Sequence, residues 1–189
     1  MLEQEMKIPV PSHAPLRERL TATGARLLHP LLFEENWVLD DTTGTLAAAG
    51  RLLRVRRAGE RTLLTVKEPG TFIGGVKSRV ERETAVGSVE ETLAILAALG
   101  FAPVRRYQKR RESWALGPVV VALDETPAGA FVELEGPEAS LAAAAATLGL
   151  DPGTAVRGSY LDVWTAFRAA HPDAPAEMVF AGAAAPARG

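Results

Sequence analysis

Charged residues recur at alternate positions along the strand-like segments of this chain, and this pattern constrains the fold more than any other feature. Glu3, Glu5 and Lys7 share one face of the first segment, because successive side chains of a β-strand point to opposite faces. The same spacing recurs in four later segments, at Arg54 and Arg56, at Arg79, Glu81 and Glu83, at Lys109 and Arg111, and at Glu133 and Glu135. Ionic side chains on one face of strand after strand favour a closed sheet that surrounds a charged lumen.

The alternation of polar and apolar residues predicts eight strands, at residues 2–9, 27–39, 51–58, 61–67, 79–86, 104–116, 118–124 and 130–135. Several of the connections are short and contain glycine, which is typical of hairpins, whereas residues 70–75 are expected to form a longer flexible loop. An eight-stranded barrel is just wide enough inside to be filled by side chains or to hold one small ligand. We therefore expect an α+β fold built on an eight-stranded barrel.

Helical spacing predicts four helices around this barrel, at residues 12–24, 88–100, 138–148 and 159–170. They would cover apolar side chains that point away from the lumen, such as Met6, Ile8, Leu53, Val55, Leu64 and Val66. After Pro172 the sequence is rich in alanine, proline and glycine, so we expect one domain over residues 1–170 and a flexible tail over residues 171–189.

Composition excludes several classes of protein. A net charge of −2 and an isoelectric point near 6.0 argue against a nucleic-acid partner, which would favour a basic excess. The chain has no cysteine, which excludes disulfides and thiolate zinc sites, and its three histidines lie near expected loops and helix ends. No signal peptide or membrane-spanning run is visible, so we expect a cytoplasmic protein without a membrane partner.

The basic residues in matched positions suit a phosphate chain, because arginine can bind two phosphate oxygens at once and lysine adds a compact charge. The candidates for substrate binding are Lys7, Arg54, Arg56, Lys67, Arg79, Lys109 and Arg111. Tyr107 has the same parity as Lys109 and could also face the lumen and touch substrate. The alternative interpretation is a set of solvated side chains on edge strands.

The acidic residues suit hard divalent cations, because carboxylates packed together repel one another unless they are neutralised. The candidate ligands of Mg²⁺ or Mn²⁺ are three E-x-E pairs and one aspartate: Glu3, Glu5, Glu81, Glu83, Asp124, Glu133 and Glu135. The alternative is that these acids only neutralise the neighbouring basic residues in internal salt bridges. Both can hold, because a loaded lumen would exchange internal pairs for metal and substrate.

The chain resembles the CYTH superfamily, which contains class IV adenylate cyclases and triphosphate tunnel metalloenzymes. The resemblance rests on the E-x-E-x-K signature of residues 3–7 and on later motifs in the order of that family, over roughly residues 1–168. These motifs are Leu53–Arg56, Thr65–Pro69, Arg79–Glu83, Leu99–Phe101, Lys109–Arg111, Leu123–Glu125, Phe131–Glu135 and Ser159–Tyr160. The resemblance implies an antiparallel tunnel that binds triphosphates together with Mg²⁺ or Mn²⁺.

The resemblance implies two enzymatic activities. The first is hydrolysis of the terminal phosphate of inorganic, nucleoside or thiamine triphosphate, which we favour, and the second is conversion of ATP to cyclic AMP and pyrophosphate. In either case we expect catalytic roles for Glu3, Glu5, Lys7, Lys109 and Arg111. A third hypothesis is a non-catalytic module that binds polyphosphate or nucleotides, although such a module would need only the basic residues. A homodimer is possible, since members of the family are often dimeric.

Overall fold

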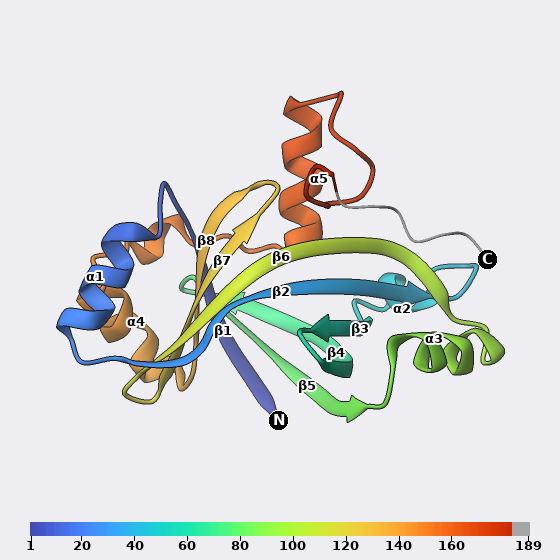
Figure 1. Ribbon diagram of the computed structural model, residues 1–189, viewed down its shortest axis with the longest axis horizontal. Helices are drawn as coiled ribbons and strands as arrows, with labels where there is room; N and C mark the ends of the chain where they lie inside the picture. The colour runs from blue at the N-terminus through green and yellow to red at the C-terminus, as the bar shows by residue number, and fades with distance from the viewer. Residues whose placement is uncertain (183–189) are drawn as a thin grey trace.

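The computed structural model describes residues 1–182 and has a closed eight-stranded barrel at its centre (Figure 1). The strands are β1 (Leu2–Val10), β2 (Arg26–Asp40), β3 (Leu52–Ala58), β4 (Arg61–Ile73), β5 (Val76–Val86), β6 (Ala102–Leu116), β7 (Val119–Thr126) and β8 (Gly129–Glu135). All neighbouring strands are antiparallel, and their order around the barrel is β1-β5-β4-β3-β2-β6-β7-β8. The α+β barrel expected from the alternating charges is therefore confirmed.

Five α-helices and one 3-10 turn flank the barrel in the described part of the chain: α1 (Ala14–Ala22), α2 (Thr45–Ala48), α3 (Val89–Ala98), α4 (Glu138–Thr147), η1 (Pro152–Thr154) and α5 (Tyr160–Ala170). The four expected helices are present, and the single-turn helix α2 was not predicted. Ser88 and Ser159 cap α3 and α5 as expected, whereas α1 begins after His13 and not after Ser12. None of the helices in residues 1–182 is long and apolar enough to cross a membrane.

The apolar core lies outside the barrel wall, between the sheet and its helices. One cluster packs Met6 and Ile8 of β1 with leucines of α1 and α4, the two helices at the left of Figure 1. A second cluster packs Leu53 and Val55 of β3 against α3, with Leu64 and Val66 of β4 beside them. The prediction that these apolar positions point outward beneath helices is confirmed, and it leaves the opposite face of each strand to the ionic side chains.

The segment from Gly70 to Gly75 is not the flexible loop that the glycines suggested. Strand β4 continues to Ile73 and pairs with Val76 of β5, so only Gly74 and Gly75 form the turn of a tight hairpin. Both glycines have positive φ angles, of 58° and 84°, which a two-residue hairpin turn requires and which residues with a Cβ rarely adopt. The prediction was wrong because glycine provides turn geometry as readily as it provides flexibility.

A third apolar cluster fills one end of the barrel interior. Val38, Tyr107 and Phe131 share parity with the lumen-facing residues of their strands, and they pack against α5 and Met178. Figure 1 shows α5 and the segment that follows it standing on one side of the barrel, above β6. The lumen is therefore closed by side chains where this cluster lies.

The chain after α5 packs against the barrel, so the expectation of a loose tail from residue 171 is wrong for its described part. Met178 is fully buried, and its carbonyl oxygen accepts a hydrogen bond of 2.8 Å from the backbone N–H of Gln108. The backbone N–H of Phe180 donates to the Gln108 side chain at 3.1 Å. Composition predicted mobility here because one methionine among small residues is a weak signal. Residues 183–189 of the expected tail lie outside the described residues.

Replacing Met178 with alanine should lower the free energy of unfolding by about 2–5 kcal/mol, the usual range for truncating a buried methionine. The reason is that Met178 has no exposed surface and closes the third cluster. Urea unfolding followed by circular dichroism measures the change. Leu99→Ala, at a side chain that is 68% exposed, is the matched control and should change stability by no more than about 0.5 kcal/mol. A Met178→Ala protein as stable as this control would show that the segment is dispensable.

Candidate functional site

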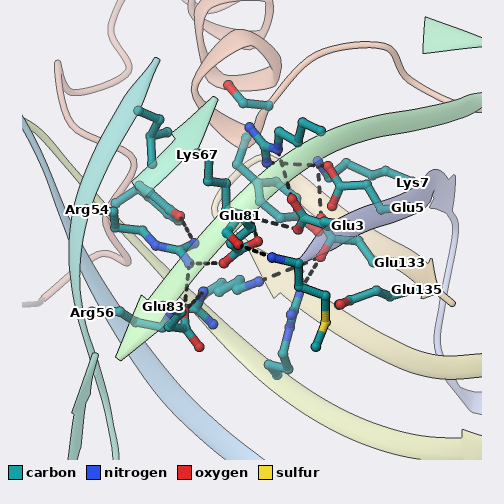
Figure 2. A pocket seen from close by; sticks show the side chains of 18 of the residues that line it. Glu3, Glu5, Lys7, Arg54, Arg56, Lys67, Glu81, Glu83, Glu133 and Glu135 are labelled. Atoms are coloured by element: carbon teal, nitrogen blue, oxygen red, sulfur yellow. Dashed lines mark hydrogen bonds and ion pairs between the residues drawn. The ribbon is translucent and has the colours of Figure 1, made fainter. Parts of the chain in front are cut away.

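The barrel holds a cavity of about 600 Å³ that is lined mainly by ionic side chains (Figure 2). The sequence-predicted site residues that line it are Glu3, Glu5, Lys7, Arg54, Arg56, Lys67, Arg79, Glu81, Glu83, Lys109, Arg111, Glu133 and Glu135. The remaining predicted residue, Asp124, lies directly behind this lining and is fully buried. The expected convergence is therefore found: the lining residues come from six strands, and Asp124 adds a seventh.

The neighbouring strands β1, β4 and β5 contribute a group of acids joined by two basic side chains. Glu3 lies between Lys67 Nζ, at 2.7 Å, and Arg79 Nε, at 2.9 Å. Lys67 Nζ also contacts Glu81 at 2.8 Å, and Arg79 reaches Glu5 at 3.6 Å. Because these groups lie on three adjacent strands, the internal salt bridges foreseen from the sequence also hold the barrel wall together.

Asp124 of β7 is the centre of a second group, in which nearly every polar atom has a partner. Its carboxylate accepts hydrogen bonds from Lys109 Nζ at 3.0 Å, Arg111 Nε at 2.7 Å and the Tyr160 hydroxyl at 2.6 Å. Arg111 also contacts Glu133. Burial opposes the charge of Arg111, but the carboxylates of Asp124 and Glu133 outweigh it and raise the pKa of Arg111 well above its usual value. Arg111 is thus held charged and oriented by residues of the protein itself.

Arg54 and Arg56 of β3 are held more loosely. Arg54 Nη2 lies 3.5 Å from Glu83, and Arg56 lies 3.6 Å from Glu34 and 3.7 Å from Glu83, all longer than the usual charge-assisted hydrogen bond. The buried Nε atoms of both arginines have no hydrogen-bond partner among the described residues. Because a buried N–H donor without an acceptor destabilises the protein, this wall of the lumen is suited to bind an anion.

Glu34 of β2, which contacts two basic residues of the lumen lining, is a residue that the sequence reasoning missed. It is 5% exposed and lies 3.6 Å from both Arg56 and Lys109. Burial opposes its charge, but the neighbouring Lys109, Arg111 and Arg56 lower the pKa of Glu34 to about 2. The parity that it shares with Asn36 could have identified it. The adjacent acid Glu35, which pairs with Arg106 and Arg57 outside the lumen, obscured that signal.

The carboxylates at the other side of the lumen have the chemistry to hold a divalent cation. Glu5 of β1 and Glu135 of β8 are direct cross-strand partners, and like charges in such positions repel. Burial, followed by the charges of Glu3 and Glu133, raises the pKa of Glu135, and no basic side chain in residues 1–182 pairs with it within 4.0 Å. No three acidic or histidine side chains among the described residues already converge as a metal site. The donor set nevertheless fits Mg²⁺ or Mn²⁺, which would relieve the repulsion.

The family model described as CYTH domain matches residues 1–160. No curated protein matches the chain at a significant level.

Solved structures share the fold. A presumed adenylate cyclase from Vibrio parahaemolyticus superposes with a TM-score of 0.77 at 20% identity, over 87% of this chain and 98% of that one. A protein from Pyrococcus horikoshii gives 0.73 at 22% identity, over 85% and 98%. A presumed adenylyl cyclase from Hippeastrum, with a dominant triphosphatase activity, gives 0.68 at 18% identity, over 89% and 96%. At these identities the likeness shows the fold alone.

Replacing Glu34 with glutamine should destabilise the protein at neutral pH and progressively less as the pH falls. The folded-state pKa of Glu34, about 2, lies below its ordinary value of 4.5. A depressed pKa means that the carboxylate contributes stability above about pH 4.5 and loses that contribution as the pH falls through 2. The shift corresponds to about 3 kcal/mol.

Urea unfolding at several pH values from 7 to 3 measures the difference between the wild-type and Glu34→Gln proteins. Glu125→Gln is the matched control, since Glu125 forms a half-exposed pair with Arg110 outside the lumen and should change stability little. A wild-type–Glu34→Gln difference that stays constant over this pH range would contradict the assignment.

Proposed function

The chain belongs to the CYTH domain family, and on this basis we propose that it is a metal-dependent enzyme that hydrolyses the terminal phosphate of a triphosphate in its lumen. The substrate class is inorganic triphosphate or a nucleoside or thiamine triphosphate. The observation that carries this proposal is the wall formed by Arg54 and Arg56, buried guanidinium groups that keep N–H donors without partners beside an enclosed cavity. A chain of phosphates offers the closely spaced anionic oxygens that such a wall requires.

The basic residues of the lumen bind and orient the phosphate chain in this proposal. Arg54 and Arg56 contact it from β3, and Lys7, Lys109 and Arg111 contact it from β1 and β6. As water attacks the terminal phosphorus, a new P–O bond forms, the bond to the bridging oxygen breaks, and negative charge grows on the leaving diphosphate, while the proton of the water passes to a lumen carboxylate and from there to solvent. Cations that are already fixed in the lumen stabilise that charge without having to reorganise.

The acidic residues provide for the metal ion and the attacking water. Glu3, Glu5 and Glu135 would hold Mg²⁺ or Mn²⁺, with Glu81 and Glu133 as further carboxylates of the same cavity. When bound, the cation supplies charge neutralisation for the phosphate oxygens. The remaining carboxylates of the lumen orient the attacking water. The presence of these acids supports an enzyme over a module that only binds polyphosphate, because binding alone would need only the basic wall.

The size of the cavity favours one alternative, conversion of ATP to cyclic AMP and pyrophosphate. A volume of about 600 Å³ lies within the range of pockets that hold drug-sized molecules and leaves room for an organic group beside a triphosphate. In that reaction the ribose 3′-hydroxyl attacks the α-phosphorus and the bond to pyrophosphate breaks. Against this alternative, the described lining offers few apolar or aromatic side chains for a base, namely Met1, Leu52, Tyr107 and Tyr160.

A panel of inorganic tripolyphosphate, ATP and thiamine triphosphate, each with Mg²⁺ or Mn²⁺, tests the proposal. We expect phosphate release from at least one of them without cyclic AMP. Arg56→Ala should lower kcat/KM about 10- to 100-fold, the effect of losing one hydrogen bond to a charged group. Arg110→Ala, which removes a charge outside the lumen, is the matched control and should retain activity. Cyclic AMP from ATP would identify the cyclase, and tight binding without any product would identify the binding module.

The Glu135→Gln substitution should weaken the response to metal without lowering the stability of the protein. Glu135 repels Glu5, its partner on the adjacent strand, and the nearby Glu3 when no cation is present, so Glu135→Gln should leave the melting temperature unchanged or higher in EDTA. The increase in melting temperature that Mn²⁺ causes in the wild-type protein should shrink, and turnover should need more metal. Glu125→Gln is again the control. An unchanged response to Mn²⁺ would remove Glu135 from the metal site.

A further inference from the structure

Two tyrosines reach the cavity, and they differ in how their hydroxyl hydrogens are used. The hydroxyl of Tyr160 donates to Asp124 at 2.6 Å, so its hydrogen is engaged within the protein. The hydroxyl oxygen of Tyr107 accepts a hydrogen bond from Arg54 Nη1 at 3.3 Å. Its own hydrogen has no acceptor in the part of the chain that the structure describes. The O–H group of Tyr107 is therefore available to donate a hydrogen bond to a ligand in the lumen.

The position of Tyr107 makes this donor unusual. The residue is only 6% exposed, and its ring packs with Val38 and Met178 in the third apolar cluster, while its hydroxyl borders the cavity. The ring is thus fixed by packing on one side, and the hydroxyl can reach only the lumen. A buried hydroxyl without an acceptor carries a desolvation penalty, which a suitable ligand atom would remove.

The charges around Tyr107 identify the kind of atom that fits. Burial raises the pKa of Tyr107, but Arg54, Lys109 and Arg56 outweigh burial and lower it from its ordinary value. No carboxylate accepts a hydrogen bond from this hydroxyl in residues 1–182. Three cations converge on a polarised O–H group, so its natural acceptor is an oxygen that carries full negative charge.

We propose that Tyr107 contacts the substrate directly by donating its hydroxyl hydrogen to an anionic phosphate oxygen held by Arg54, Arg56 and Lys109. The inference rests on the proposed function and deepens it. It places one phosphate contact at the border between the ionic lumen and the third cluster. A neutral or apolar group placed there would leave both the hydroxyl and the arginines without partners, so this border selects for a charged phosphate oxygen.

The test compares Tyr107→Phe, which keeps the ring and removes only the hydroxyl, with the wild-type protein. Isothermal titration calorimetry with tripolyphosphate in EDTA measures binding, and phosphate release with Mg²⁺ gives kcat/KM. We expect Tyr107→Phe to weaken both about 10- to 100-fold, with urea unfolding unchanged. Tyr160→Phe is the matched comparison: it removes a bond already made in the free protein, so it should lower stability and weaken binding less than Tyr107→Phe does.

A second background separates direct contact from an effect through Arg54. If Tyr107 only orients Arg54, Tyr107→Phe should have no further effect once Arg54→Lys has removed the guanidinium that it contacts. If Tyr107 touches the substrate, most of its effect should persist in the Arg54→Lys background. Loss of the effect there, or equal binding by wild-type and Tyr107→Phe proteins, would overturn this inference alone. A wild-type protein that neither binds nor hydrolyses any triphosphate would overturn the proposed function, and this inference with it.

Discussion

Burial of many ionic side chains inside a closed sheet is the constraint on which the rest of this structure depends. Removing a charge from water costs several kcal/mol, and a buried ion pair recovers that cost only when its geometry and hydrogen bonds are good. The ion pair of Glu3 with Lys67 and that of Asp124 with Arg111 meet this condition, but they do not provide a folding force of their own. That force comes from the apolar clusters outside the barrel, which is why the helices must cover the wall.

The two sides of the lumen differ in how completely their groups are satisfied. Around Asp124, the cations Lys109 and Arg111 and the Tyr160 hydroxyl converge on one carboxylate with short hydrogen bonds. Along β3, the arginines lie farther from their partners and keep N–H groups without acceptors. The satisfied side is suited to keep its shape in the free protein. The under-satisfied side is suited to gain most from a ligand, because buried N–H groups there lack hydrogen-bond acceptors within the protein.

Parity in the sequence was sufficient to predict the lumen, because a strand has only two faces and the helices cover one of them. It placed Glu3, Arg54 and Glu133 together although more than 70 residues separate some of them in the chain. Parity did not single out Glu34, because the two consecutive acids Glu34 and Glu35 leave it ambiguous which of them faces inward. It also could not identify Met178, since the burial of one side chain depends on the closed end of the barrel and on no periodic pattern.

The alternation of acids and bases around the lumen has a physical consequence for any polyanion that enters it. Such a ligand competes with carboxylates such as Glu81 and Glu83 for the cations that now neutralise them. Each carboxylate that loses its partner becomes an uncompensated buried charge, which is strongly unfavourable. A divalent cation that enters with the polyanion restores the balance by taking the place of the lost basic partners. A lumen of mixed charge therefore couples the two ligands, because each offsets the electrostatic cost that the other creates. A purely basic lumen would bind the polyanion equally well with or without the cation.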